Sequence, residues 1–313
     1  MTRPPRTPRT LRPTRMLALL AIALVALLVT VRLTGVAERL AYFPSNATFL
    51  TPPQYQDVSF TTEDGLTLHA WFMPAPGATP DNPGPAVLHC HGNAGTLADH
   101  EPFSAFLARR GISVLLFDYR SYGRSDTGSL NRNALLKDTR AAFEALRARP
   151  EVDPERVGAL GVSLGGAFAA ALAAENKEVR SLALVSTFST WQGVAHDALP
   201  GLGPLLMPPG LEQQSAVTQL APRHLLLLHG DADRIIHPRH AQRLADAAQS
   251  ANVPHELVII KDGDHNALLP ASQTAQDTLT NFFTRTLSQH QPPEQSDTPV
   301  SPTGGEGVRD ADG

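Results

Sequence analysis

The chain has 313 residues, a formal net charge of −4 and 42% hydrophobic residues, enough for one large domain or two small ones. Its body carries no basic stripe, which argues against a nucleic-acid-binding protein. The single cysteine, Cys90, excludes an intramolecular disulfide and any multi-cysteine zinc or iron–sulfur site.

The N-terminus combines a basic segment with an apolar one. Five arginines fall within residues 1–15, and residues 16–31 are apolar except for one threonine. As a helix this core spans roughly 24 Å, and residues 33–37 extend it toward the ~30 Å of a hydrocarbon layer. We expect a single transmembrane signal anchor over 16–37, with a cytoplasmic N-terminus and the catalytic domain on the exoplasmic or periplasmic side. The alternative is a cleaved signal, with residues 35–37 as the cleavage site and a secreted product.

The two parts that follow differ in composition. Residues 38–287 hold the apolar runs that a folded domain needs. Residues 288–313 are rich in Pro, Ser, Gly, Gln and acidic residues and have almost no large apolar side chain. Such a segment buries too little surface to offset its ordering entropy, so we predict a disordered tail.

The domain begins with a predicted hairpin. Apolar residues alternate on either side of Asp64-Gly65, a pair that suits a tight turn. Continuous apolar runs then alternate with helix-length segments; the runs are 86–90, 112–117, 157–162, 179–185, 224–228 and 256–260. Runs that are apolar on both faces are typical of strands buried between helices. The pattern predicts an α/β domain whose mostly parallel sheet is covered by helices on both faces.

One segment breaks this rhythm. Residues 188–218 contain four prolines among several leucines and a methionine, between two predicted strands. An apolar insertion of this length is consistent with a small lid over a site.

A candidate nucleophile follows the strand at 157–162. Ser163 lies in the sequence Gly-Val-Ser-Leu-Gly and precedes an Ala-rich segment. A Gly-x-Ser-x-Gly turn between strand and helix holds a serine exposed beside a base, which its weakly nucleophilic hydroxyl requires. The alternative is a small-residue helix start used only for close packing.

The sequence His91-Gly-Asn-Ala-Gly95 follows an earlier strand and supplies a candidate oxyanion hole. Two backbone N–H groups hold the oxyanion in sites of this kind, one from the residue after the nucleophile. Leu164 and Asn93 are the expected donors. A plain glycine turn is the alternative for this loop.

The acid and the base come from two later loops. Asp233 is preferred over Asp231 as the acid because an acid normally lies a few residues beyond its strand; Asp231 would then tighten the turn. His265 follows the last strand and completes the chain order Ser, Asp, His. A metal site formed by the two aspartates with His237 and His240 is a rival interpretation, but no second ligand cluster supports it.

These motifs, with Asp118-Tyr-Arg-Ser-Tyr-Gly123 and the anchor-like N-terminus, resemble membrane-anchored α/β-hydrolase-domain proteins over residues 38–287. That group is described as lysophospholipase-like, acyl-protein-thioesterase-like or serine-aminopeptidase-like. The resemblance implies an α/β-hydrolase fold with Ser163, Asp233 and His265 as the triad and Asn93 and Leu164 at the oxyanion hole. Acyl transfer on such a triad requires no cofactor or metal. In such proteins a glycine usually stands where Ser121 does here, and residues 188–218 show no motif that aligns.

The expected function is hydrolysis of acyl esters or thioesters through an acyl-enzyme, on a small-molecule or lipid acyl substrate. Amide hydrolysis of the serine-aminopeptidase kind is an alternative. A catalytically silent, membrane-anchored binding scaffold is the alternative from a different class.

Overall fold

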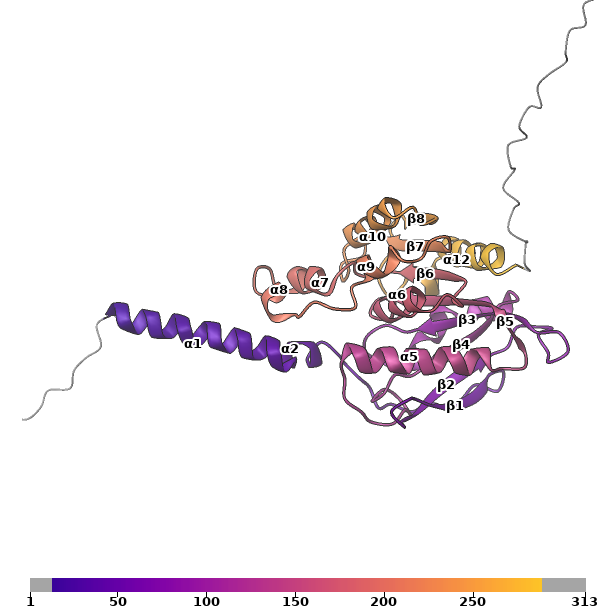
Figure 1. The fold of residues 1–313 in the computed structure, drawn as a ribbon. Helices are drawn as coiled ribbons and strands as arrows, with labels where there is room; N and C mark the ends of the chain where they lie inside the picture. The colour runs from indigo at the N-terminus through magenta and orange to yellow at the C-terminus, as the bar shows by residue number, and fades with distance from the viewer. Residues whose placement is uncertain (1–12, 289–313) are drawn as a thin grey trace, which may run out of the picture.

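The computed structural model describes residues 13–288 (Figure 1). One eight-stranded sheet with the order β1-β2-β4-β3-β5-β6-β7-β8 forms its centre. The strands are β1 (Gln56–Thr61), β2 (Thr67–Met73), β3 (Gly84–Cys90), β4 (Ser113–Phe117), β5 (Val152–Val162), β6 (Ser181–Val185), β7 (His224–Gly230) and β8 (His255–Ile260). Strand β2 pairs antiparallel with β1 and β4, and all other pairs are parallel. The predicted hairpin and mostly parallel sheet are therefore confirmed.

Helices cover both faces of the sheet because its central strands are apolar on both sides. One core is built from α5 (Arg132–Arg147), α6 (Gly165–Glu175) and α10 (Arg239–Ser250), with Phe143, Phe168 and Leu244 fully buried. The other core contains Phe106 from α4 (Ala105–Arg109) and Phe283 from α12 (Gln273–Thr286). The short helices α3 (Leu97–His100), η1 (Glu101–Phe103) and α11 (Leu268–Ala271) complete this second layer.

The segment between β6 and β7 forms the expected insertion, but as short helices rather than a loop. These are α7 (Trp191–Ala198), α8 (Gly203–Leu206) and α9 (Gln213–Val217). Trp191, Met207 and Val217 are buried, so the insertion packs onto the domain through its large apolar side chains. We call residues 188–218 the lid.

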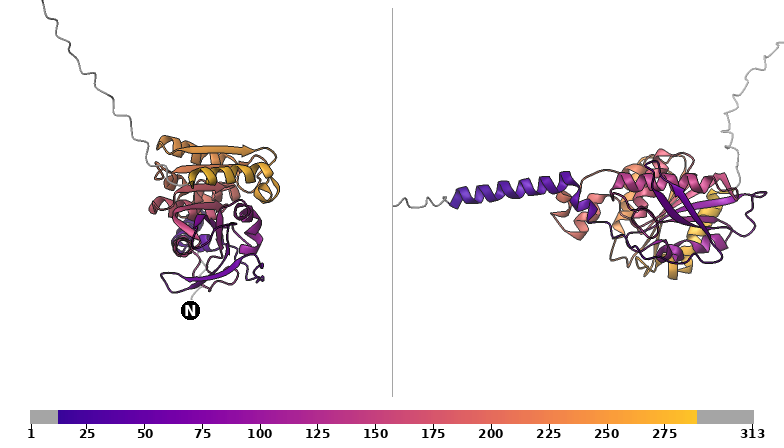
Figure 2. Two further views of the ribbon diagram at one scale, coloured as in Figure 1. Left: turned by 90° about the vertical axis from the view of Figure 1, so that its right-hand side faces the viewer. Right: turned by 90° about the horizontal axis from the view of Figure 1, so that it is seen from below.

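Helix α1 (Pro13–Thr34) precedes the domain and extends away from it (Figures 1 and 2). Gly35, at a φ of 66°, breaks the helix, and α2 (Val36–Arg39) follows. Within residues 13–288 no helix is both long and apolar enough to cross a membrane. The anchor expected over 16–37 stays a prediction, while most of the basic segment and of the tail lies outside the described residues.

The base of α1 is attached to the lid. The Arg32 guanidinium donates hydrogen bonds to the backbone oxygens of Pro204 and Leu205, at 3.2 and 3.0 Å. These oxygens lie in the last turn of α8, where a cation is favoured because the carbonyls there lack helical partners. Figures 1 and 2 show α7 and α8 beside the base of α1.

Candidate active site

Ser163 stands on a tight elbow between β5 and α6, with a φ of 52°. Its backbone N–H donates to Val185 O at 2.9 Å, which ties the turn to β6. A Cβ at Gly165 would lie 1.9 Å from Cys90 O, and one at Gly161 would lie 2.5 Å from the Cα of Gly166. The glycines of the motif are therefore needed for close approach to β3 and to the following helix.

The structure brings Ser163, His265 and Asp233 into one hydrogen-bonded chain. His265 Nε2 lies 3.1 Å from Ser163 Oγ, and His265 Nδ1 lies 2.7 Å from Asp233 Oδ2. The acid comes from the loop after β7 and the histidine from the loop after β8. This geometry allows the imidazole to take a proton from the serine while the carboxylate fixes its orientation.

Asp233 is fully enclosed and firmly held. Its Oδ1 accepts hydrogen bonds from the N–H groups of Ile235 and Ile236, both at 2.9 Å. Burial by itself raises the pKa of Asp233, but the hydrogen bonds from His229 and His265 outweigh it and hold that pKa well below its ordinary value. The carboxylate is therefore ionised at neutral pH and presents Oδ2 to His265.

His229 is a site residue that the sequence did not reveal. Its Nε2 lies 3.1 Å from Asp233 Oδ2 and 2.8 Å from Ile236 O, so this nitrogen must carry a proton. His229 lies on the buried strand β7, and the alternation of side chains along a strand does not indicate which group a given side chain contacts. Only the folded sheet brings His229 next to the carboxylate of Asp233.

The neighbouring acidic and histidine residues have other partners. Asp231 Oδ1 accepts from Asp262 N at 2.6 Å and so ties the acid loop to the histidine loop. His240 is bound to Ser189 and to Asp197 Oδ2, at 2.9 and 3.0 Å, away from the two aspartates of the acid loop. Over residues 13–288 no cluster of three or more His, Cys, Asp or Glu is arranged to hold a metal.

The two expected oxyanion donors lie beside Ser163, since Asn93 and Leu164 line the same cavity. The N–H of Leu164 lies at the N-terminus of α6, where helical N–H groups lack intrahelical partners and favour negative charge. The side chain of Asn93, unlike its backbone N–H, is engaged in hydrogen bonds to other residues through both its nitrogen and its oxygen. Its Nδ2 donates to Ala41 O at 2.6 Å, and its Oδ1 accepts from Phe43 N and Tyr122 Oη, both at 3.0 Å.

These hydrogen bonds hold residues 40–43, the segment after α2, against the oxyanion loop. We call this segment the connector. No sequence pattern predicts this contact, because the connector and the loop are about fifty residues apart. Tyr122, in the loop after β4, donates its hydroxyl to the same amide.

A cavity of about 420 Å³ opens beside Ser163. Its walls come from α2, the connector, the lid and the acid loop and are almost entirely apolar; they include Ala37, Ala41, Phe43, Phe188, Trp191, Val194, Leu199, Leu206, Met207, Ile235 and Ile236. We call it the acyl cavity. Ser163 is therefore exposed to an apolar space rather than to a polar cleft.

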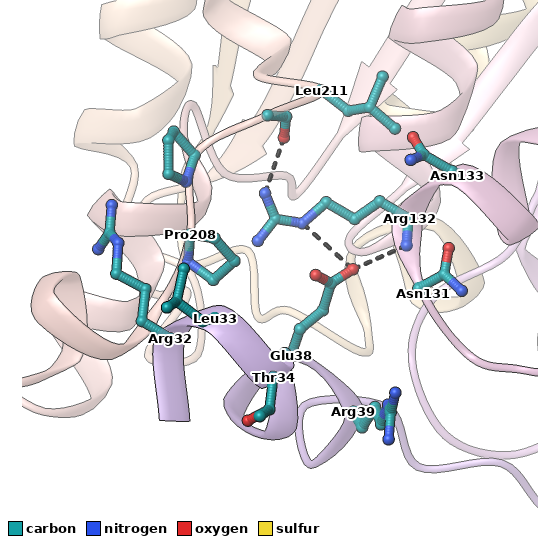
Figure 3. A pocket seen from close by; sticks show the side chains of 13 residues that line it. Arg32, Leu33, Thr34, Glu38, Arg39, Asn131, Arg132, Asn133, Pro208 and Leu211 are labelled. Atoms are coloured by element: carbon teal, nitrogen blue, oxygen red, sulfur yellow. Dashed lines mark hydrogen bonds and ion pairs between the residues drawn. The ribbon is translucent and has the colours of Figure 1, made fainter. Parts of the chain in front are cut away.

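A second cavity, of about 520 Å³, lies on the polar side of α2 and does not include Ser163 (Figure 3). Arg132 lies in its centre: its backbone N–H donates to Glu38 Oε1 at 2.7 Å, and its guanidinium donates to Gly210 O at 2.8 Å (Figure 3). The same guanidinium stacks over the Trp191 ring at 4.3 Å. Arg132 thus braces α2 and the lid around the acyl cavity.

The model of the prolyl oligopeptidase family matches residues 104–290, which is more than half of the chain. The chain belongs to the prolyl oligopeptidase family. The protein YfhR of Salmonella typhi, described as uncharacterised, is 33% identical over 273 residues, which are 82% of this chain and 91% of YfhR.

Two solved structures share the fold of this family member. An esterase of Pyrococcus furiosus, Pf2001, gives a TM-score of 0.66 at 21% identity and covers 79% of this chain and 97% of its own. The acylaminoacyl peptidase of Pyrococcus horikoshii gives 0.63 at 17% identity, over 78% of this chain and 43% of its own. The expected α/β-hydrolase fold and the hydrolase class are confirmed.

Proposed function

We propose that this protein is a serine hydrolase that cleaves acyl esters or thioesters through an acyl-enzyme. The observation that carries the proposal is the chain from Ser163 through His265 to Asp233, with the serine facing an apolar cavity. The chemistry needs no metal or cofactor, because each proton and charge has a protein group to receive it.

In the first half-reaction Ser163 Oγ bonds to the carbonyl carbon, and its proton passes to His265 Nε2. The N–H groups of Asn93 and Leu164 stabilise the oxyanion, and Asp233 stabilises the imidazolium. Collapse breaks the bond to the leaving alcohol or thiol, which takes the proton from His265. Water then attacks the acyl-enzyme, gives its proton to His265, and releases the acid as Ser163 recovers its proton.

The acyl cavity supports fatty acyl groups as the substrate class. Apolar walls stabilise a hydrocarbon chain by roughly 0.8 kcal/mol per buried methylene, whereas a charged aminoacyl group would lose its hydration there. Amide hydrolysis is the second candidate, favoured by membership of the prolyl oligopeptidase family and by the fold shared with an acylaminoacyl peptidase.

A fluorophosphonate probe tests the proposal. We expect it to label the wild-type protein and Ser250→Ala, a control at an exposed helical serine, but not Ser163→Ala. Absence of labelling in folded wild type would contradict the proposal and favour a silent binding scaffold. Acyl esters of increasing chain length, assayed beside aminoacyl amides, then separate the two enzyme activities.

We further propose that α1 and the arginines before it hold the enzyme at a membrane, with the catalytic domain on the exoplasmic or periplasmic side. The support is that large apolar side chains along α1, including Leu17, Ile22 and Val25, are 60–65% exposed. Such a helix is poorly suited to water and suited to lipid. Recovery of the full chain in the membrane fraction after alkaline carbonate extraction is the expected result; release into the soluble fraction would contradict it.

A further inference from the structure

The exposed apolar side chains of the domain are concentrated around one opening. Beyond α2, most of the large apolar residues that are exposed belong to the segments that line the acyl cavity: Leu40, Phe43, Leu199, Leu202, Leu205 and Ile235. Single exposed apolar residues are ordinary, but a group around a cavity mouth marks an interaction surface. We call Leu40, Leu199, Leu202 and Leu205, together with Leu33 at the end of α1, the lid face.

The lid face is continuous with α1. Arg32 bonds to the carbonyls at the end of α8, so Leu33 and Leu205 belong to directly joined segments. Leu33 is 80% exposed and Leu205 is 54% exposed. Since α1 points away from the domain on the side of α7 and α8 (Figures 1 and 2), anything that surrounds α1 also meets the lid face.

The charges beside this surface point to the kind of partner. Arg39 is exposed in α2 and, together with Arg32, lines the second cavity, which lies on the polar side of α2 (Figure 3). Apolar side chains flanked by arginines suit a lipid surface, where the apolar groups enter the acyl region and the cations lie at the phosphates.

We propose that the lid face docks on the lipid bilayer and that the acyl cavity takes its substrate directly from the membrane. The substrate class is then an acyl ester or thioester whose chain resides in lipid. This inference rests on the membrane association and the acyl hydrolase activity proposed above. Its surface part is tested without any activity measurement.

Fluorescence of a labelled cysteine tests the docking. Cys90 is fully buried, and burial raises the pKa of its thiol, so an introduced surface cysteine is the one that reacts. Full-length Leu205→Cys, labelled with the NBD fluorophore in phosphatidylcholine–phosphatidylglycerol vesicles, is expected to be quenched by doxyl-labelled lipid. Ile259→Cys, 44% exposed on β8, is the matched control and is expected to stay unquenched.

If the protein floats with the vesicles but the label is quenched at neither position, the lid face does not dock on lipid and the proposal is overturned. The proposal is also overturned if the label at Leu205→Cys is shielded by a second protein molecule instead of by lipid. Failure of the protein to float with the vesicles contradicts the membrane proposal itself.

Kinetics test the substrate route. The double variant Leu202→Ser/Leu205→Ser changes two side chains outside the cavity lining. We expect about a tenfold lower rate on p-nitrophenyl palmitate dissolved in the vesicles, because two apolar contacts with lipid are lost. The rate on water-soluble p-nitrophenyl butyrate should be unchanged, and the control Leu50→Ser/Ile259→Ser should match wild type on both.

If wild type and Leu202→Ser/Leu205→Ser hydrolyse the vesicle substrate at equal rates, the proposed entry of substrate from the membrane is overturned. The hydrolase proposal is unaffected by that result. Absence of hydrolysis of both esters by wild type contradicts the hydrolase proposal, and the quenching result still decides the docking.

Discussion

Replacing Asp233 tests how much catalysis depends on the orientation and charge stabilisation of His265, because the nucleophile Ser163 is left unchanged. Asp233→Asn keeps the shape of the side chain but removes the charge that pairs with the imidazolium of His265. We expect kcat to fall by about 10⁴-fold, as loss of the acid does in other serine hydrolases. The check is steady-state kinetics on a soluble ester with circular dichroism of both proteins; a loss below about tenfold would assign the acid elsewhere.

The same residue predicts how stability depends on pH. Because the folded-state pKa of Asp233 lies below its unfolded value of about 3.9, the stabilisation is fully present above that value and is lost as the pH falls toward the folded pKa. The gap in the free energy of unfolding between wild type and Asp233→Asn should therefore narrow below about pH 4. Urea unfolding at several pH values measures it, and a gap that stays constant contradicts the assignment.

Asn93 is expected to act through position, because its side chain holds the loop whose N–H we assign to the oxyanion hole. Asn93→Ala keeps that N–H but frees the loop from Ala41, Phe43 and Tyr122. We expect kcat to fall about 10- to 100-fold with little change in KM, since a displaced donor weakens the transition state alone. Tyr122→Phe removes a single bond and should have a smaller effect, while Tyr55→Phe, outside the site, should have none. A change confined to KM would argue against this role.

At the level of elements, the lid depends on one buried cation. Arg132→Met removes the hydrogen bond of the guanidinium to Gly210 O and its ion pair with Glu38 at 3.5 Å. Glu38 then keeps only hydrogen bonds from the backbone N–H at position 132 and from Tyr42 Oη, with no cation beside its charge. Removing one member of a buried pair typically lowers stability by about 3 kcal/mol, against about 0–1 kcal/mol for an exposed pair. Arg140→Met, which breaks the exposed pair with Glu175, is the matched control. Urea unfolding measures the free energy of unfolding of both variants. Equal losses relative to wild type would contradict the role of Arg132 in holding the lid.

How far the sequence predicts these elements depends on whether a feature is local. The strand runs, the hairpin at Asp64-Gly65 and the elbow at Ser163 follow from short patterns, because burial on both faces and a tight turn impose their own residues. The lid helices could not be predicted, since each is only four to eight residues long, too short for an apolar period, and prolines interrupt the segment between them. The bonds of Asn93 to the connector and of His229 to Asp233 are equally invisible, because each joins segments that only the completed sheet brings together.

For the whole molecule, the orientation across the membrane is the open prediction. The arginines before α1 favour a cytoplasmic N-terminus, which places the domain on the other side. A reporter fused after Ser288 that is active only outside the cytoplasm is the expected result. A reporter active only in the cytoplasm would reverse the topology, although it would leave the catalytic proposal intact.

The clamp of Asn93 on the connector also limits the reach of the enzyme. Only about seven residues separate the end of α1 from Ala41, and even a fully extended chain of that length spans roughly 25 Å. The oxyanion loop therefore stays within that distance of the end of α1, and the catalytic serine cannot reach molecules that lie farther away. With α1 held in a bilayer, the zone of reaction becomes a thin layer above the lipid, so a folded protein could offer an acyl group to it only on a flexible terminus.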